Sequence, residues 1–206
     1  MILLLAVAIG LLAGVARARV SGRRLVAPPL SMVWLVLVAF LPQWLAFYGP
    51  TSWLRLPDHL VPIGLVTSQI LLLIFVWANR GLPGFWVLGL GLGLNLLVIV
   101  LNGGWMPISP ETLGRMYPDR AADVWIVGER LGTSKDVILA VADTRMAWLS
   151  DRFILPSWSP YRVAYSLGDI FITAGAFILL WSLGGLSHIQ PTRTNYEYAN
   201  PGQSGT

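Results

Sequence analysis

Few side chains in this sequence could do chemistry, and four of them interrupt otherwise apolar stretches. These four are Gln69, Asn95, Asn102 and Asp169. If the stretches cross a bilayer, an unpaired polar group costs several kcal/mol, and an acid at that depth is a candidate for a proton, ion or ligand site. Asn95 and Asn102 are seven residues apart, which is two helical turns, so they share one helix face.

The depth of these groups decides which of them can meet. At about 1.5 Å per residue, Asn95 lies about 10 Å deeper than Asn102, and Asp169 falls between them. We therefore expect Asp169 to occupy a polar pocket in the outer half of the protein, with Asn95 or Asn102 donating a hydrogen bond to it. A structural tether is the alternative: Asp169 would cap its own helix or bind a loop arginine such as Arg152 or Arg162.

Other reactive residue types are scarce. The chain has no cysteine, which excludes disulfides, thiolate nucleophiles and iron–sulfur clusters. Its two histidines, His59 and His188, are too few for a His-based metal site, and we expect no metal. They lie at opposite edges of the apolar stretches, where a pigment macrocycle could be ligated axially, although isolated histidines at such edges more often face solvent.

The charged residues argue against two further classes of function. Fourteen Lys and Arg against ten Asp and Glu leave a net charge of +4, with no basic tract to neutralise phosphates. We expect no nucleic-acid partner. Asp143, Asp151 and Asp169 could serve as acids or bases, but no His, Cys or GxSxG motif accompanies them, so we expect no enzyme.

The elements that position these residues follow from the composition. With 55% hydrophobic and 12% charged residues, the chain is too apolar for a soluble domain, in which roughly a quarter of residues are charged. A bilayer core needs roughly 17–25 apolar residues as a helix. Windows of about that size predict an all-α membrane protein with five transmembrane helices and a cap of short helices on the outer face. The predicted spans are 1–16, 30–48, 60–78, 85–101 and 163–186.

Basic residues set the expected orientation. Four arginines follow the first apolar stretch, whereas a signal peptide carries its charge before that stretch. This order favours an anchor with its N-terminus outside, although Ala16-Arg17-Ala18 resembles a cleavage site. Six basic residues then lie inside against Arg55 alone in the short outer loop. We expect a multi-pass protein of the cell inner membrane with a cytoplasmic C-terminus.

This topology divides the chain into four parts. We expect a four-helix transmembrane part at 1–101, an outer-face loop with short helices at 102–162, the fifth transmembrane helix at 163–186 and a polar cytoplasmic tail at 187–206. Small residues four apart predict helix-packing seams in two blocks, Gly10-Leu11-Leu12-Ala13-Gly14 and Gly89-Leu90-Gly91-Leu92-Gly93.

Two helices are predicted in the outer segment. Ser109 followed by Pro110 indicates the start of a short helix that ends before Pro118. A capping box from Thr133 to Asp136 precedes an apolar-rich run to 153, which predicts a second helix. Arg145 and Arg152 lie seven residues apart on that second helix. We expect these two arginines to contact lipid headgroups or other anions, or to pair with Asp151 or Asp169.

Three blocks of sequence resemble a known family. They are Asn102-Gly103-Gly104-Trp105-Met106-Pro107-Ile108, the stretch from Asp143-Thr144 to Leu149-Ser150-Asp151-Arg152, and Ser166-Leu167-Gly168-Asp169-Ile170. Chiefly through the N-G-G-x-M-P and S-x-G-D blocks, the chain resembles an uncharacterised family of small five-span bacterial membrane proteins. The resemblance covers most of the chain up to the tail. It implies a multi-pass inner-membrane protein and names no reaction.

Among functions, the sequence favours an accessory or structural subunit of a larger membrane complex, such as an energy-transducing one. Its partners would be membrane lipids and other membrane-protein subunits. Its cofactor is unknown, with a lipid, a quinone or a pigment as the classes left open. The alternatives are a small transporter or proton-linked protein that uses Asp169, and an outer-face enzyme that acts on a lipid or quinone.

Overall fold

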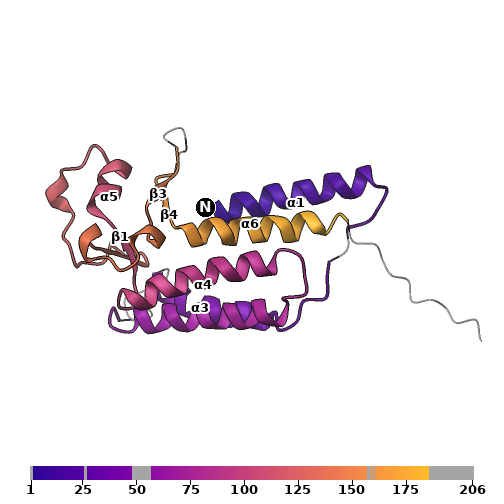
Figure 1. The fold of residues 1–206 in the computed structure, drawn as a ribbon, viewed down its shortest axis with the longest axis horizontal. Coiled ribbons are helices and arrows are strands. Elements are labelled where there is room, and N and C mark those ends of the chain that lie inside the picture. The colour runs from indigo at the N-terminus through magenta and orange to yellow at the C-terminus, as the bar shows by residue number, and fades with distance from the viewer. Residues whose placement is uncertain (1, 26, 48–56, 157–158, 160, 186–206) are drawn as a thin grey trace, which may run out of the picture.

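Five long apolar helices form the larger part of the fold. The computed structural model describes residues 2–25, 27–47, 57–156, 159 and 161–185. The main contacts join the helices in a row with the order α1, α6, α4, α3, α2. Figure 1 shows α1, α6, α4 and α3 in this order. Their bounds are Ile2–Val20 for α1, Trp34–Phe47 for α2, Val61–Ala78 for α3, Phe85–Leu101 for α4 and Leu167–Ser182 for α6.

The expectation of an all-α protein is confirmed in part: the described residues are mostly helical with apolar helices, but the segment between α4 and α6 also contains two small sheets. Two stretches among the described residues, Leu3–Val20 and Val61–Ala78, are long and apolar enough to cross a membrane by length and composition. The other three long helices are apolar but shorter. The number of crossings therefore stays a prediction.

A stripe of small residues attaches α1 to α6. Ala6, Gly10, Gly14 and Ala18 are buried at intervals of four residues. A Cβ added at Gly10 would lie 3.1 Å from Leu180 Cβ, and one at Gly14 would lie 2.5 Å from the Leu180 carbonyl oxygen. The predicted seam at Gly10 and Gly14 is thus confirmed, and it packs on a helix of the same chain.

The second predicted seam is confirmed in part, because Gly89 lies against the Val76 side chain of α3 and Gly91 lies against α6. On α4, Gly91 lies against the Gly168 carbonyl and the Ile172 backbone of α6, and Gly84 lies against Gly175. Gly93 has no neighbouring atom within 4 Å of an added Cβ, so the prediction for this residue is wrong. The glycines that allow α4 and α6 to approach are spaced by seven residues, because antiparallel helices meet once every two turns.

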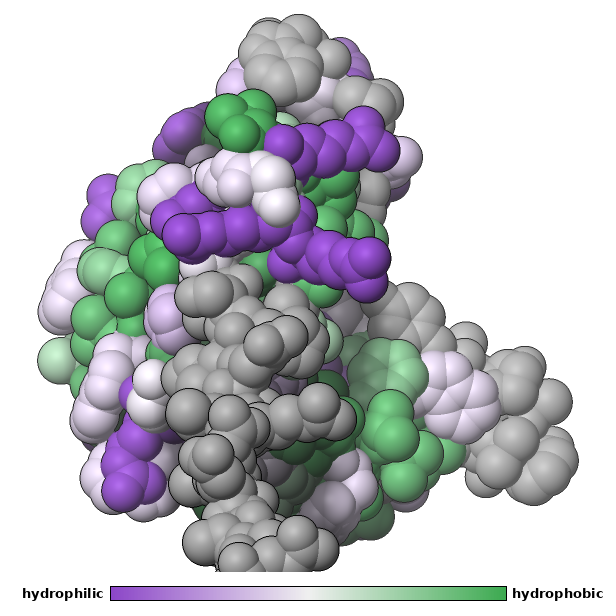
Figure 2. All heavy atoms as spheres, turned by 90° about the vertical axis from the view of Figure 1, so that its right-hand side faces the viewer, coloured by the Kyte–Doolittle hydropathy of each residue, from purple (hydrophilic) through white to green (hydrophobic). Residues whose placement is uncertain are grey.

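Arginines gather at the end of the row that lies opposite the loops of the outer segment. They are Arg17, Arg19, Arg23, Arg24 and Arg80. No acid accompanies them among the described residues of this end. Figure 2 views this end and shows long hydrophilic side chains over an apolar surface. Arg17 lies over the Trp181 ring at 4.3 Å, and Arg23 donates to the Gly185 carbonyl at 2.9 Å.

The segment between α4 and α6 folds over the opposite end of the row, and we call it the cap (Figure 1). Its strands are β1 (Met106–Ile108), β2 (Asp136–Ile138), β3 (Phe153–Ile154) and β4 (Ala164–Tyr165), and its helical elements are α5 (Pro110–Met116), η1 (Ala122–Val124), η2 (Val141–Asp143) and η3 (Ala147–Leu149). The short helix predicted after Ser109 is confirmed as α5, because the Ser109 side chain accepts a hydrogen bond from the Thr112 N–H at 3.1 Å.

The fully buried strand β1 organises the cap. It pairs in parallel with β2 on one side, with Met106 opposite Asp136, and Ile108 forms a bridge with Asp151 on the other side. A further bridge joins Val137 to Arg130. Four segments far apart in the sequence therefore form one small ladder.

The second predicted helix is wrong, because residues 133–153 contain β2, η2 and η3 in its place. The apparent capping residues serve a local turn: the Ser134 hydroxyl accepts from the Asp136 N–H at 3.0 Å. Val137 and Ile138 are β-branched and pair with β1, so tertiary pairing overrides the local helical pattern. Arg145 and Arg152 consequently do not share a helix face.

Candidate functional site

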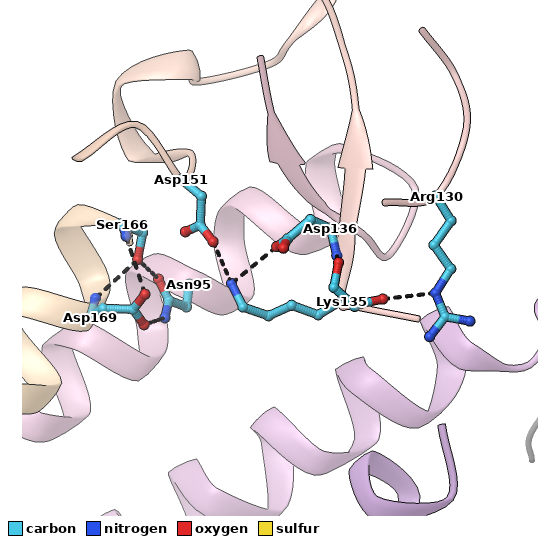
Figure 3. Close-up of polar contacts among 8 residues, drawn as sticks. Asn95, Arg130, Lys135, Asp136, Asp151, Ser166 and Asp169 are labelled. Carbon is cyan, nitrogen blue, oxygen red and sulfur yellow. Dashed lines mark hydrogen bonds and ion pairs between the residues drawn. The ribbon is translucent and has the colours of Figure 1, made fainter. Parts of the chain in front are cut away.

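Two groups of polar side chains meet where the cap contacts α4 and α6. The first, the Asp169 group, consists of Asn95, Ser166 and Asp169. The second, the Lys135 group, consists of Lys135, Asp136 and Asp151. Figure 3 shows the two groups next to each other, with Lys135 extending toward the Asp169 group.

The Asp169 group closes the start of α6. Ser166 is the N-cap: its hydroxyl accepts from the Asp169 N–H at 3.0 Å, and the Asp169 carboxylate accepts from the Ser166 N–H at 3.1 Å. Asn95 on α4 donates to the other Asp169 oxygen at 2.8 Å and accepts from the Ser166 hydroxyl at 2.8 Å. Each polar atom of this buried contact therefore has a partner, which is what a stable polar contact between two apolar helices requires.

The structure thus brings Asn95 to Asp169 with the donor and acceptor expected from the sequence. It also contains the capping contact of the alternative interpretation. Asn102 lies elsewhere: it ends α4, donates to the Arg145 carbonyl at 2.9 Å and accepts from the Arg145 N–H at 3.0 Å. A catalytic or transport role for the Asp169 group stays a prediction.

Gln69 does not join this group. It is half-buried on α3, and its side-chain oxygen has no partner among the residues that the structure describes. Another glutamine makes the polar contact between α2 and α3, because Gln43 donates to the Ser68 hydroxyl at 2.6 Å and Ser68 donates to the Ala39 carbonyl at 2.6 Å.

The Lys135 group is an ion-pair cluster with more acid than base. Lys135 Nζ lies 2.7 Å from Asp151 Oδ2 and 3.4 Å from Asp136 Oδ1. Asp151 is only 2% exposed, and its Oδ1 has no hydrogen-bond partner within the described part of the chain. Asp136 Oδ1 likewise has no hydrogen-bond partner within the described residues, because its contact with Lys135 lacks hydrogen-bond geometry.

Burial and neighbouring charge shift the titration of this cluster in the cap. Burial, reinforced by the like charges of Asp136 and Asp169, raises the pKa of Asp151 to about 8 against the opposing effect of Lys135. Burial alone would lower the pKa of Lys135, but the three carboxylates around it raise that pKa above its ordinary value. The cluster therefore favours a charged lysine beside an aspartate that retains its proton near neutral pH.

Arg130 holds the loop that carries Lys135. Its guanidinium forms an ion pair with Asp58 at 2.5 Å and donates to the Ala46 carbonyl at the end of α2 at 3.1 Å. It also donates to the carbonyls of Thr133 and Ser134 at 2.8 and 2.7 Å. These contacts fix residues 130–135 against α2 and the start of α3, so Lys135 is positioned by the fold.

A pocket of about 590 Å³ lies between α2 and the cap, next to the Lys135 group. Its walls combine apolar residues of α2 with polar residues of the cap, as the lining residues Phe40, Phe47, Lys135, Asp136 and Asp151 illustrate. We call it the α2–cap pocket. Within the described residues, no group of three His, Cys, Asp or Glu side chains could hold a metal ion.

The remaining predicted site residues are dispersed. Arg145 and Arg152 are exposed on the cap, and the described residues offer neither of them an ion-pair partner. Arg152 lies 5.9 Å from the Phe153 ring. His59 is exposed in the turn before α3, and His188 lies outside the described residues. Headgroup binding by the arginines and axial ligation by His59 stay predictions.

Sequence reasoning missed Arg130, Lys135 and Gln43. Lys135 lies inside the apparent capping box from Thr133 to Asp136. That motif indicates the start of a helix and gives no sign of an ion pair at Lys135. The short distance between Lys135 and Asp151 depends on a parallel pairing of segments thirty residues apart, for which the sequence has no local signal.

Backbone packing explains two of the blocks singled out above. Gly103 and Gly104 have φ angles of +74° and +88°, which favour glycine, and Gly104 lies against Pro62 on α3. In the Ser166–Ile170 block, Ser166 and Asp169 form the α6 cap, and Gly168 leaves room for the Asn95 side chain. Both blocks therefore hold the cap to the helices.

Comparison with known proteins finds similarity only to proteins without an assigned activity. The model of a family of unknown function (DUF5317) matches residues 28–181. An uncharacterized protein of Thermotoga maritima is 30% identical over 145 residues, which cover 68% of this chain and 73% of the relative. No solved structure matches. The expected membership of a family of unknown function is confirmed.

Proposed function

The chain belongs to the family of unknown function DUF5317, and we propose that it is an accessory subunit of a larger membrane complex. In this proposal the five apolar helices cross the inner membrane, with the N-terminus and the cap outside and the C-terminus in the cytoplasm. The protein is not an enzyme. It contacts neighbouring subunits and lipids through its helices.

One observation carries the proposal: the helices lie in a row, and one edge helix is bound through a single narrow seam. Apart from that seam, α1 is largely exposed, with Leu4 at 66% and Leu12 at 69%. The row therefore has broad apolar faces. Such a shape suits lateral packing against other membrane proteins better than enclosure of a transport path.

The charge distribution supports the orientation. Five arginines and no acid occupy one end of the described helices, whereas the cap carries both signs in equal number. Positive residues near short loops favour the cytoplasmic side, and a long segment of balanced charge translocates largely regardless of its charge.

Co-purification tests the proposal. Full-length tagged protein, extracted from its own membrane in mild detergent, should retain stoichiometric partners identified by mass spectrometry. We expect the double substitution Leu4→Ala and Leu12→Ala on the free face of α1 to reduce partner recovery severalfold, because it removes packing surface.

Leu37→Ala is the matched control, since Leu37 is equally exposed at 69% but lies on α2 at the other edge of the row. It should leave recovery unchanged. A monodisperse monomer without partners would contradict the subunit proposal, and loss of partners with Leu37→Ala alone would contradict the assignment to α1.

The alternatives derive less support from the geometry. A proton-linked role for Asp169 requires a carboxylate free to exchange protons, whereas both of its oxygens accept hydrogen bonds that also fix α6. An outer-face enzyme requires a nucleophile and a base beside a substrate pocket, and the chain has no cysteine and only two histidines to supply them.

A further inference from the structure

The α2–cap pocket changes character along its length. At one end is Phe40 of α2, which is 53% exposed on the surface that we assign to the membrane interior. Phe47 lies two turns further, at the outer end of α2, and the polar residues of the cap follow. The volume of about 590 Å³ therefore extends from a lipid-facing surface to a charged group outside the membrane.

The polar end of this pocket has acceptors that need donors. Asp151 is 2% exposed, and within the described residues its Oδ1 has no hydrogen-bond partner. Asp136 Oδ1 is likewise buried without one. An ionised carboxylate only accepts hydrogen bonds, so a ligand that binds with both carboxylates ionised must donate them. Burying such an acceptor without a partner is unfavourable, and a donor from the ligand would offset that cost.

The pocket contains opposite charges in equal number. Asp136 carries a negative charge, and Asp151 carries a second one once an added cation favours its ionised form; Lys135 and Arg162 carry the positive ones. Arg162 is on the α5 side, where it donates to the Met116 carbonyl at 3.0 Å and lies 3.5 Å from Asp119 Oδ2; its side chain stays 50% exposed. A zwitterionic group, with an ammonium for the aspartates and an anion for the arginine, matches this arrangement.

We propose that the α2–cap pocket binds an aminophospholipid headgroup. The primary ammonium donates to Asp136 and Asp151, the phosphate lies toward Arg162, and an acyl chain leaves along α2 past Phe40. The apolar lining of α2 and the orphaned carboxylate oxygens together select an amphiphile over a soluble amine. This inference depends on the membrane placement proposed above but not on the presence of partner subunits.

Lipid exchange onto the purified full-length protein tests the proposal. Phosphatidylethanolamine, phosphatidylcholine and phosphatidylglycerol with identical acyl chains are added in detergent, and bound lipid is measured by native mass spectrometry. We expect phosphatidylethanolamine to bind at least about tenfold more tightly than phosphatidylcholine, because a trimethylammonium group has no N–H to donate. Equal binding of the two would overturn the proposal.

Substitutions locate the site. Asp136→Asn should lower the affinity for phosphatidylethanolamine about tenfold and reduce its preference over phosphatidylcholine, since a neutral amide oxygen is a weaker acceptor for the ammonium N–H groups than a carboxylate. Asp143→Asn is the matched control, because Asp143 is an exposed cap acid that does not line the pocket. An equal effect of both substitutions would overturn the assignment to this pocket.

Two further outcomes would also overturn it. Tightest binding of phosphatidylglycerol would indicate an anion site at Lys135 and Arg162, and displacement of bound lipid by a short-chain hydroquinone would indicate a hydroxyl donor. Because the assay uses the isolated protein, a negative lipid result would not contradict the subunit proposal. Absence of co-purified partners would likewise not contradict the lipid site. The lipid comparison in the unmodified protein needs no variant, so misfolding of Asp136→Asn cannot obscure the result.

Discussion

Asp151 is the residue whose environment departs most from that of an ordinary surface aspartate. Its pKa rises to about 8 through burial and the nearby carboxylates, from 3.8 for the free group. The folded protein therefore keeps a proton that the unfolded chain loses. The contribution to stability is complete below pH 3.8 and is lost as the pH rises toward about 8.

We predict that the cap opens more readily as the pH rises through this window. Hydrogen exchange of the Ile138 and Asp151 amides, which lie in the cap ladder, should show falling protection between pH 5 and 9, after correction for intrinsic exchange rates. Asp151→Asn should flatten this dependence, because an amide does not titrate. Asp143→Asn should retain it, and pH-independent protection in the unmodified protein would contradict the prediction.

Of the contacts made by Asp169 and Asp151, only one could be predicted from the sequence. The contact between Asn95 and Asp169 was predictable, because depth along two apolar helices follows from residue counting. The contact between Lys135 and Asp151 was not, since it depends on β1 lying between β2 and residue 151. A three-residue parallel pairing has no periodicity that a sequence pattern could reveal.

At the scale of elements, the approach of α4 to α6 depends on glycines. Gly168→Ala would place a Cβ against the Asn95 side chain, which must then leave its hydrogen bonds to Asp169 and Ser166. We predict a loss of about 1–3 kcal/mol, typical of overpacking, measured as a lower midpoint of thermal unfolding in detergent.

Gly93→Ala on α4 is the control for this substitution, because no atom lies within 4 Å of the added Cβ. It should be neutral or stabilising by up to about 1 kcal/mol through helix propensity. If both substitutions lowered the midpoint equally, the contact between Gly168 and Asn95 would not be the cause.

Elements with an unbroken apolar pattern were predicted well. The long helices begin and end within a few residues of the predicted spans, and α5 begins at the predicted cap. The helix predicted over residues 133–153 was wrong because their apolar residues pair in the cap ladder and join a buried cluster that contains Met106 and Leu149. The helical spacing of these residues was coincidental. Long apolar helices are predicted from local sequence, whereas a small irregular cap is fixed by contacts between distant segments.

The proposed orientation of the molecule depends on the separation of its charges. Five arginines lie at one end of the described helices, and the Lys135 group lies at the other. If positive residues stay in the cytoplasm, the α2–cap pocket must open to the outer leaflet, and its lipid would be drawn from that leaflet.

Because the chain has no cysteine, single substitutions can test this orientation on a clean background. Arg24→Cys reports the arginine end, and Asp123→Cys and Val141→Cys report exposed positions of the cap. We predict that a membrane-impermeant thiol reagent labels both cap positions in intact spheroplasts and labels position 24 only after permeabilisation. Labelling of position 24 together with the cap before permeabilisation would place both on one side. It would contradict the topology on which the subunit proposal and the lipid site both depend.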